Sequence, residues 1–368
     1  MKIPFYGIDR FFKAHADNIK EIFTTVGKTG KMLMGEEVEL FEQTLAQFCS
    51  RKYAIAVSSC TDALYFALLS VGVKRGDEVI VPSFSFIATA TPIIQAGAVP
   101  VFTDIRPDTF SMDAEDLKKK ITSKTKAIIF VHLYGSFCPI EEIALIAKEN
   151  NIPLIEDNAH SLGSKSNDNI LAGTHGEISC VSFDPTKIIA GFGTAGALLT
   201  DNYSIFKYVN KLRYQGKNSD TGKFDVLGFN SRISTFQGAL LNYQLNMIDK
   251  LIGRRRLIAD FYNRCIDKIK GIEYVQKTQS TFHKYVITTN NRDDLKLFLE
   301  KKGIQTMIHY NEALYEHPLF NNYSYRAENI QMVQHIKSTV LSLPIYPELT
   351  DEETSYITSC LQEFFCSF

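Results

Sequence analysis

The first half of the chain alternates short apolar runs with segments whose apolar residues recur at helical spacing. One such segment is Glu36–Phe48, in which Val38, Phe41 and Leu45 share a helix face. The expected strand Ala127–His132 begins with the continuous apolar run 127–131, which is typical of a parallel sheet covered on both faces. The other expected strands are Ala54–Val57, Glu78–Val81, Val99–Thr103, Pro153–Glu156, Ile178–Phe183 and Ala197–Thr200, and the other expected helices are Ala63–Val71, Ala88–Gln95, Ala114–Lys120 and Ile140–Glu149.

The pattern changes after about residue 202. Residues 214–231 are rich in Gly, Asn, Ser and Asp, which predicts a long loop, and one long helix is expected from Ser234 to about Ile269. Its arginines 254–256 indicate a solvated helix face, with an anion-binding patch as the alternative. A small α+β unit follows, with expected strands Tyr285–Thr288 and Gln305–His309 and an expected helix Asp293–Lys302.

These elements predict an α/β protein with a mostly parallel central sheet and helices on both faces. A chain of 368 residues is too long for one small core. We therefore expect a large domain over residues 1–245 and a smaller C-terminal α+β domain over residues 246–368.

Composition and charge exclude several classes of protein. Hydrophobic residues make up 45% of the chain, enough for a substantial core, and the formal net charge is −1. Neither nucleic acid nor a membrane is expected as a partner, because the charge is nearly balanced and apolar runs are too short to span a bilayer. The seven cysteines are scattered and never spaced as CxxC, so we expect no disulfide framework, no metal site and a cytoplasmic location. The first residues also lack the apolar core of a secretion signal.

Candidate chemistry begins with Lys187, which follows the strand ending at Phe183. A lysine can form a Schiff base with an aldehyde when its surroundings lower its pKa. By itself, a lysine in a loop is usually only solvated, so the case depends on its partners. Asp157 ends another buried strand, where open α/β sheets bind ligands, and His160 lies three residues further on. The alternative roles are a helix cap for Asp157 and a structural role for His160.

Two further segments could complete a cofactor site. Ser58–Asp62 precedes the helix Ala63–Val71, and hydroxyls and amides at a helix N-terminus can bind phosphate, although ordinary N-capping is the alternative. Phe86 follows a strand and could stack on a flat ring, or simply belong to the core. The literal GxGxxG at Gly191–Gly196 leads into a strand and not a helix, which argues against a dinucleotide site.

The order of phosphate turn, aromatic, acid and lysine resembles the nucleotide-sugar aminotransferases of the DegT/StrS family, which are fold type I enzymes dependent on pyridoxal 5'-phosphate (PLP). The resemblance covers nearly the whole chain. The segments that carry it are Val57–Leu64, Gly76–Ile80, Phe86–Ala90, Val131–Gly135, Glu156–His160, Ser182–Lys187 and Gly228–Arg232.

The resemblance implies a role for each candidate residue. Lys187 would bind PLP covalently, Asp157 would hold the pyridine nitrogen, His160 the phenolic oxygen, and Phe86 would stack on the ring. The phosphate would be bound by the remaining candidates: Ser59, Cys60, Thr61 and Ser182, with Asn230 from the other subunit of a homodimer. Three residues depart from the family pattern: Cys60 and Ala195 replace frequent glycines, and Ser231 replaces a frequent tyrosine.

The implied reaction moves the amino group of L-glutamate to C3 or C4 of a nucleotide-linked keto sugar, for surface polysaccharide or glycan synthesis. One alternative is a sugar dehydratase, in which histidine replaces the lysine; another is a non-catalytic regulatory or binding protein of the same fold. The nucleotide stays open. Plausible diphosphate contacts are Arg213, Lys217 and Arg232, with ordinary surface charges as the alternative, and the roles of His309 and Tyr310 are equally open.

Overall fold

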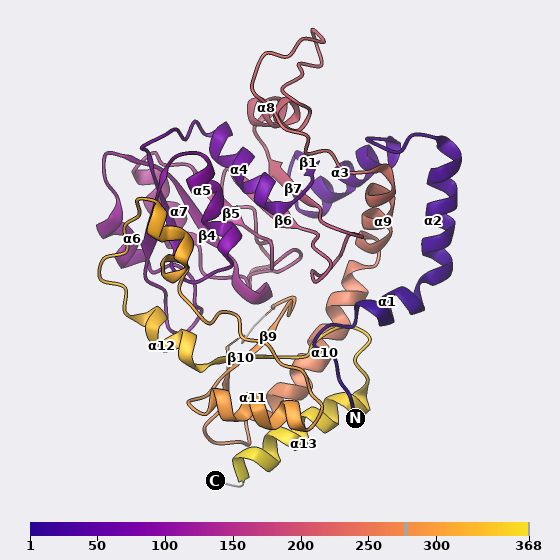
Figure 1. Ribbon diagram of the computed structural model, residues 1–368, viewed down its shortest axis with the longest axis vertical. Coiled ribbons are helices and arrows are strands. Elements are labelled where there is room, and N and C mark those ends of the chain that lie inside the picture. Colours follow the sequence, from indigo (N-terminus) through magenta and orange to yellow (C-terminus); the bar gives the residue numbers. More distant parts are fainter. Residues whose placement is uncertain (276–278, 367–368) are drawn as a thin grey trace.

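The computed structural model describes residues 1–275 and 279–366 (Figure 1). Its main sheet has seven strands in the order β1-β7-β6-β5-β4-β2-β3. Strand β7 runs antiparallel to both β1 and β6, and the other neighbours are parallel. The strands of this sheet are β1 (Tyr53–Val57), β2 (Glu78–Pro82), β3 (Val99–Thr103), β4 (Thr125–Val131), β5 (Leu154–Asp157), β6 (Ile178–Ser182) and β7 (Gly196–Thr200).

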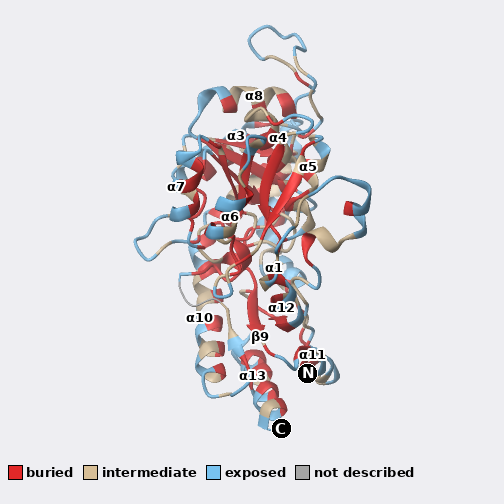
Figure 2. Cartoon of the chain, turned by 90° about the vertical axis from the view of Figure 1, so that its left-hand side faces the viewer, coloured by how far each residue is buried: buried red, intermediate tan, exposed pale blue. Residues whose placement is uncertain are grey.

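Helices cover both faces of this sheet because successive strand residues point to opposite sides. Ile55 and Val57 of β1 pack with one group of helices, whereas Ala54 and Ala56 pack with the other. The first group is α4 (Cys60–Ser70), α5 (Thr91–Gln95) and α8 (Tyr203–Arg213). The second is α3 (Glu36–Phe48), α6 (Ala114–Lys120), α7 (Glu141–Glu149) and α9 (Thr235–Leu245). Figure 2 shows the buried strands between these layers, so the predicted α/β architecture is confirmed.

A second, smaller sheet lies near the C-terminus (Figure 1). It is antiparallel, with the order β10-β9-β8, and packs against helices that include the end of the chain. Ile3 belongs to the same apolar cluster, so the N-terminal segment lies on this unit. Its elements are α10 (Ile248–Ile266), β8 (Glu273–Tyr274), β9 (Tyr285–Thr288), α11 (Arg292–Lys301), α12 (Met332–Thr339), β10 (Val340–Leu343) and α13 (Asp351–Cys366), and the N-terminal helices are α1 (Ile8–Ala14) and α2 (Ala16–Thr29).

The single long helix expected from Ser234 is wrong: the chain forms α9 and α10 with a break at Met247, whose φ is −116°. Helix α9 packs against α3 over the large sheet, whereas the second half of α10 packs in the C-terminal unit. The break allows one helix to pack in the core of the large sheet and the next to pack in the core of the C-terminal unit. Neither Pro nor Gly lies at the break. The domain boundary predicted after residue 245 falls at this point and stays a prediction.

The strand expected at Gln305–His309 is also wrong. Ile304 forms an isolated bridge with Ile3, and Met307 forms another with Ser342, so the segment divides its pairing between two neighbours. The third strand of the small sheet is β10 instead. Ala88–Gln95 likewise divides into a short 3₁₀ turn at Ile87–Thr89 and helix α5.

The solvated face expected at the arginine run is wrong for Arg255, which is buried. Its guanidinium donates to the carbonyls of Phe282 (3.1 Å) and Ile345 (2.7 Å). Arg254 and Arg256 also donate to backbone carbonyls, of Leu349 and Ser280. The run therefore joins α10 to distant loops of the C-terminal unit.

Candidate functional site

A cavity of about 520 Å³ lies at the carboxyl ends of β4, β5 and β6. Ligands bind at this edge of open α/β sheets, and the volume suits a small cofactor together with a substrate. Asn230 does not line it. The candidate residues that do are Ser59, Cys60, Thr61, Phe86, Asp157, His160, Ser182 and Lys187.

Lys187 lies in a turn that follows β6. Its amide N–H donates to the Asp184 carbonyl (2.9 Å), and the Asp184 carboxylate accepts the N–H (3.1 Å) and hydroxyl (2.8 Å) of Thr186. The loop returns to the end of the strand where the Gly191 N–H donates to the Phe183 carbonyl (2.8 Å). Burial lowers the pKa of the Lys187 ammonium, which increases the fraction of neutral amine, the form that attacks a carbonyl.

Asp157 ends β5 with its carboxylate almost fully buried. One oxygen accepts the Thr89 hydroxyl (2.8 Å) and the other accepts the Ala159 N–H (3.1 Å). Ser85 lies 2.8 Å from the same Thr89 hydroxyl and completes the chain of contacts. Burial raises the pKa of Asp157 and these contacts oppose the rise. A cationic N–H against this carboxylate would offset its desolvation, as a protonated pyridine nitrogen does.

His160 is oriented by the backbone of a neighbouring loop. The Tyr134 N–H donates to its Nδ1 (3.3 Å), so the proton of the neutral ring lies on Nε2. Burial and the nearby Lys187 ammonium hold the pKa of His160 well below its usual range, which keeps the ring neutral. His160 therefore offers one N–H donor within the cavity that contains Lys187.

The N-terminus of α4 forms the third side of the cavity. The Ser59 hydroxyl accepts the Asp62 N–H (3.1 Å), so it caps the helix and keeps its own proton for a ligand. The amides of Cys60 and Thr61 belong to the first turn, which has no acceptor within the helix. Gly196 lets this turn approach β7, because a Cβ there would lie 2.4 Å from the Cys60 nitrogen. The geometry suits a phosphate group.

The residues that depart from the family pattern have structural explanations. Cys60 packs its side chain into the apolar core, and burial raises its thiol pKa well above the usual value, so the thiol is neutral. Ala195 is buried against the other core of the large sheet. The Ser231 hydroxyl accepts the Ser58 N–H (3.0 Å) and donates to Asp62, which ties the following loop to the phosphate turn.

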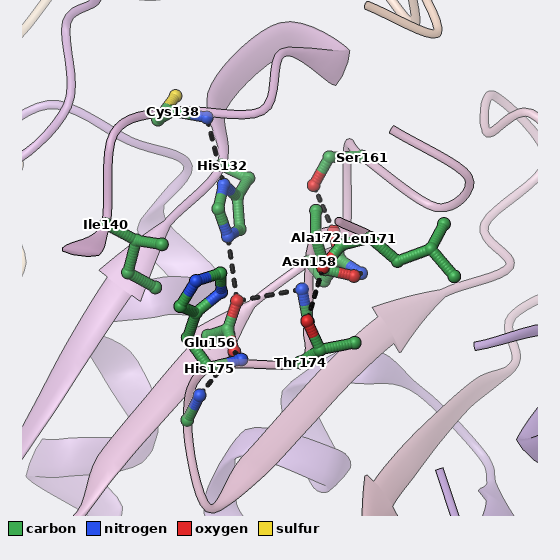
Figure 3. A network of polar contacts seen from close by, with 12 residues as sticks. His132, Cys138, Ile140, Glu156, Asn158, Ser161, Leu171, Ala172, Thr174 and His175 are labelled. Carbon is green, nitrogen blue, oxygen red and sulfur yellow. Dashed lines mark hydrogen bonds and ion pairs between the residues drawn. The ribbon is translucent and has the colours of Figure 1, made fainter. Parts of the chain in front are cut away.

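A buried polar network holds β5 next to the cavity (Figure 3). The Glu156 carboxylate accepts the Nε2–H of His132 (2.8 Å) and three amides of the loop 173–176 at 2.6 to 2.8 Å. Because the Cys138 N–H donates to His132 Nδ1 (3.1 Å), the ring proton lies on Nε2. Burial raises the pKa of Glu156, but His132 and the amides outweigh it and leave that pKa below the usual range. Glu156 therefore anchors the strand, while Asp157 faces the cavity from the other side.

The side chains of Phe86 and Asn230 are exposed to solvent in the single chain. The Phe86 ring is 55% exposed at the cavity, 6.3 Å from the Tyr310 ring, so the alternative of a core aromatic is wrong. Asn230 is exposed in the loop of residues 214–231, whose irregular structure is confirmed. It accepts a weak hydrogen bond from Arg232 (3.4 Å).

Arg213 does not serve as a diphosphate contact, because it is buried behind the sheet edge. It pairs with Glu42 and donates to the Ala56 carbonyl (2.9 Å), while Glu42 also accepts the Ala56 N–H (2.7 Å). Lys217 and Arg232 instead lie over the Tyr214 ring at 5.2 and 4.3 Å. Arg213 could not be recognised from sequence as a structural residue, because Glu42 is 171 positions away.

Arg213→Met is expected to lower the free energy of unfolding by about 3 kcal/mol, because it leaves the Glu42 carboxylate without its buried partner. Urea unfolding measures this change. Lys211→Met breaks the more exposed pair with Asp225 (3.0 Å) and should cost less than about 1 kcal/mol. Equal losses in the two variants would contradict the structural role of Arg213.

Several cavity residues had no assigned role at the level of sequence. Thr89 belongs to one of the family segments, but nothing in its spacing pointed to Asp157. Tyr6, His283 and Lys284 come from the chain start and from the segment before β9. His309 and Tyr310, which sequence reasoning left open, also line the cavity.

A lysine with a lowered pKa, a buried carboxylate at a strand end and a helix N-terminus that suits phosphate surround one cavity of an α/β sheet. This combination defines a PLP-dependent enzyme. Residues 13–362 match the DegT/DnrJ/EryC1/StrS aminotransferase family, and the chain belongs to that family. Its cofactor is PLP, and its GxGxxG leads into β7, as expected for a segment that is not a dinucleotide site.

Relatives match the chain over most of its length. A pleiotropic regulatory protein of Geobacillus stearothermophilus is 33% identical over 100% of both chains. A GDP-perosamine synthase of Escherichia coli O157:H7 is 34% identical over 90% of this chain and 91% of the relative. Among solved structures, NtdA of Bacillus subtilis with bound PMP is 31% identical, with a TM-score of 0.91 over 99% of this chain and 85% of that chain.

Proposed function

We propose that this enzyme transfers the amino group of L-glutamate to a keto group, at C3 or C4, of a nucleotide-linked deoxysugar. The observation that carries the proposal is the meeting of Lys187, Asp157 and the α4 N-terminus in one cavity. The similarity to a GDP-perosamine synthase over most of the chain supports the sugar substrate. The product would serve surface polysaccharide or glycan synthesis.

Each residue has a task that follows from its position. Bound PLP would supply a carbonyl that takes up the amino group and a ring that delocalises the electron pair left at the donor carbon. The α4 amides, with the Ser59 and Ser182 hydroxyls, would bind the phosphate, and Phe86 would cover the ring. His160 would donate its Nε2–H to the phenolic oxygen. Asp157 would keep a proton on the pyridine nitrogen.

Lys187 would also move a proton during the reaction. Its lowered pKa favours the neutral amine, which would take a proton from Cα of the donor and pass it to a carbon of the cofactor. Asp157 would act in both halves of the transfer, because both need the protonated ring nitrogen. Glutamate leaves as 2-oxoglutarate, and the sugar gains the amine.

A panel of dTDP-, UDP- and GDP-linked keto sugars with L-glutamate tests this proposal. We expect 2-oxoglutarate and an amino sugar in equal amounts with at least one acceptor, detected by mass spectrometry. Turnover of glutamate with a keto acid, but with no sugar in the panel, would contradict the sugar substrate while leaving amino transfer intact.

A non-catalytic regulatory function is the alternative, and the similarity to a regulatory protein supports it. Lys187, Asp157 and His160 are all in place in the cavity, which favours an enzyme. The absorbance of the PLP-loaded protein separates the two functions. A visible band that bleaches when glutamate is added supports catalysis, and a band that ignores glutamate supports the alternative. The presence of Lys187 also argues against the sugar dehydratase alternative, because histidine replaces this lysine in those dehydratases.

We further propose a homodimer in which Asn230 reaches the phosphate site of the other subunit. The loop 214–231 carries exposed apolar residues, with Phe224 at 66% and Leu227 at 87%, which suits burial against a partner. We place the enzyme in the cytoplasm, consistent with seven cysteines that are all free. In the described part of the chain, no helix is long and apolar enough to cross a membrane.

A further inference from the structure

Part of the cavity wall carries polar side chains that have no role in the proposed mechanism, three of them with nitrogen groups. It is built from three separate parts of the chain: the N-terminal segment, the residues before β9, and the segment that follows α11. The wall residues that carry polar groups are Tyr6, His283, Lys284, His309 and Tyr310. None of them belongs to the set assigned to the cofactor.

Lys284 is the charged group of this wall. Its side chain is buried, its Nζ donates to the Tyr6 hydroxyl (2.8 Å), and it lies 4.3 Å from the centre of the Tyr6 ring. Burial, together with the nearby Lys187 and Arg255, holds the pKa of Lys284 well below its usual range. An anion in the cavity would offset the desolvation of the Lys284 ammonium.

His283 is an independent sign of a ligand beside Lys284. Its ring is 2% exposed, lies 4.5 Å from the His160 ring, and neither nitrogen has a hydrogen-bond partner in the described part of the chain. Burial and neighbouring cations hold its pKa well below the usual range, so the ring is neutral and one nitrogen carries a proton. Buried polar groups are normally paired, which points to an N–H donor kept for a ligand.

Hydrogen bonds to residues 303–305 hold the N-terminal segment that carries Tyr6. The Ile3 N–H donates to the Gly303 carbonyl (2.9 Å), and the Gln305 N–H donates back to the Ile3 carbonyl (3.0 Å). The Phe5 N–H donates to the Gln305 side chain (3.1 Å). These contacts bring the Tyr6 hydroxyl to the Lys284 ammonium, so the cation is oriented by a fixed neutral group.

We propose that Lys284 and His283 form an anion subsite that binds a carboxylate or phosphate group of a substrate. The ammonium supplies the charge, and the imidazole N–H adds a directional hydrogen bond. The inference rests on the proposed function, because that function requires both substrates to reach Lys187 through this cavity. The anionic group belongs either to the amino donor, whose carboxylate lies next to the reacting carbon, or to an acidic substituent of the acceptor sugar.

Calorimetric titration of the PLP-loaded protein tests the subsite without turnover. The probes are glutarate, which has two carboxylates and no amine, D-glucuronate and D-glucose 6-phosphate. Lys284→Met is expected to weaken binding of at least one probe by about 10-fold or more, the effect of one charge-assisted hydrogen bond. Lys20→Met, at a side chain 73% exposed on α2, is the matched control and should leave every affinity unchanged.

The pattern of losses identifies the source of the anion. Loss for glutarate alone assigns the subsite to the donor, and the half-saturating glutamate concentration for bleaching should then rise by a similar factor. Weaker binding of D-glucuronate or D-glucose 6-phosphate, with glutarate binding unchanged, assigns the subsite to the acceptor. Unchanged affinity for all three probes, in a variant with normal PLP content, overturns the subsite.

A second variant keeps the subsite testable if Lys284→Met does not fold. Tyr6→Phe removes only the hydroxyl that orients the ammonium and should weaken the same probe by about 3-fold, the smaller effect of a neutral hydrogen bond. If Lys284→Met fails to fold, an unchanged affinity in Tyr6→Phe overturns the subsite. A wild-type protein that binds the anions but never bleaches with glutamate would instead contradict the proposed function.

Discussion

Lys187→Ala is expected to reduce amino transfer by at least about 10³-fold, because it removes the amine that we propose binds the cofactor carbonyl and moves the proton. The turn around Asp184 and Thr186 does not depend on the lysine side chain, so the fold should remain. Steady-state kinetics with glutamate and the accepted keto sugar measure the loss. The visible band of the bound cofactor should shift, because the proposed covalent link through Lys187 is then absent.

Lys165→Ala is the control for this prediction, because Lys165 is exposed on a surface loop. It should leave turnover and the absorption band unchanged. Added methylamine should restore part of the activity of Lys187→Ala, since a free amine can replace the missing proton carrier. Full turnover in Lys187→Ala without any added amine would remove Lys187 from the reaction.

Asp157→Asn is expected to reduce amino transfer by about 10³-fold, because a neutral amide does not hold the proton on the pyridine nitrogen. The same change should not destabilise the protein without PLP. Burial raises the pKa of Asp157 in the folded state, so the folded protein holds this proton more tightly than the unfolded chain does. Above that raised pKa, the ionised carboxylate therefore lowers stability, and asparagine removes this cost.

Thermal unfolding of the PLP-free protein at pH 7 measures the second part of this prediction. The melting temperature of Asp157→Asn should equal or exceed that of the wild type, and the difference should shrink as the pH falls toward the ordinary pKa of an aspartate. Asp168→Asn, at an exposed position, should change neither activity nor melting temperature. A strong loss of stability in Asp157→Asn would mean that the carboxylate serves the fold more than the cofactor.

The strands of the large sheet could be predicted because their apolar runs are local. β2, β3 and β6 each consist of residues buried along most of their length, and the sequence shows this directly. Asp157 and Lys187 were found for the same reason: each follows a buried run, where the ends of parallel strands meet. The roles that the family resemblance implies for these residues remain predictions until the variants are measured.

The expectations that the structure corrects concern residues whose environment depends on partners far away in the sequence. The α9–α10 break contains neither Pro nor Gly, and only the position of two separate cores explains it. Arg213 and Arg255 look like surface cations in the sequence, but Glu42 and the Ile345 carbonyl make their burial possible. A charged side chain can be buried only when such partners are supplied, and they come from across the fold.

The sequence by itself determined the α/β core and predicted which strand ends would line the cavity, since apolar periodicity and strand ends are local properties. Only the tertiary structure decided the opposite wall. Tyr6 and Lys284 are 278 positions apart, and His283 carries no local pattern that indicates a role. Their desolvation and mutual contact depend on how the N-terminal segment packs against the C-terminal unit. The residues proposed to bind the anionic group of a substrate are therefore the ones that the sequence could not identify.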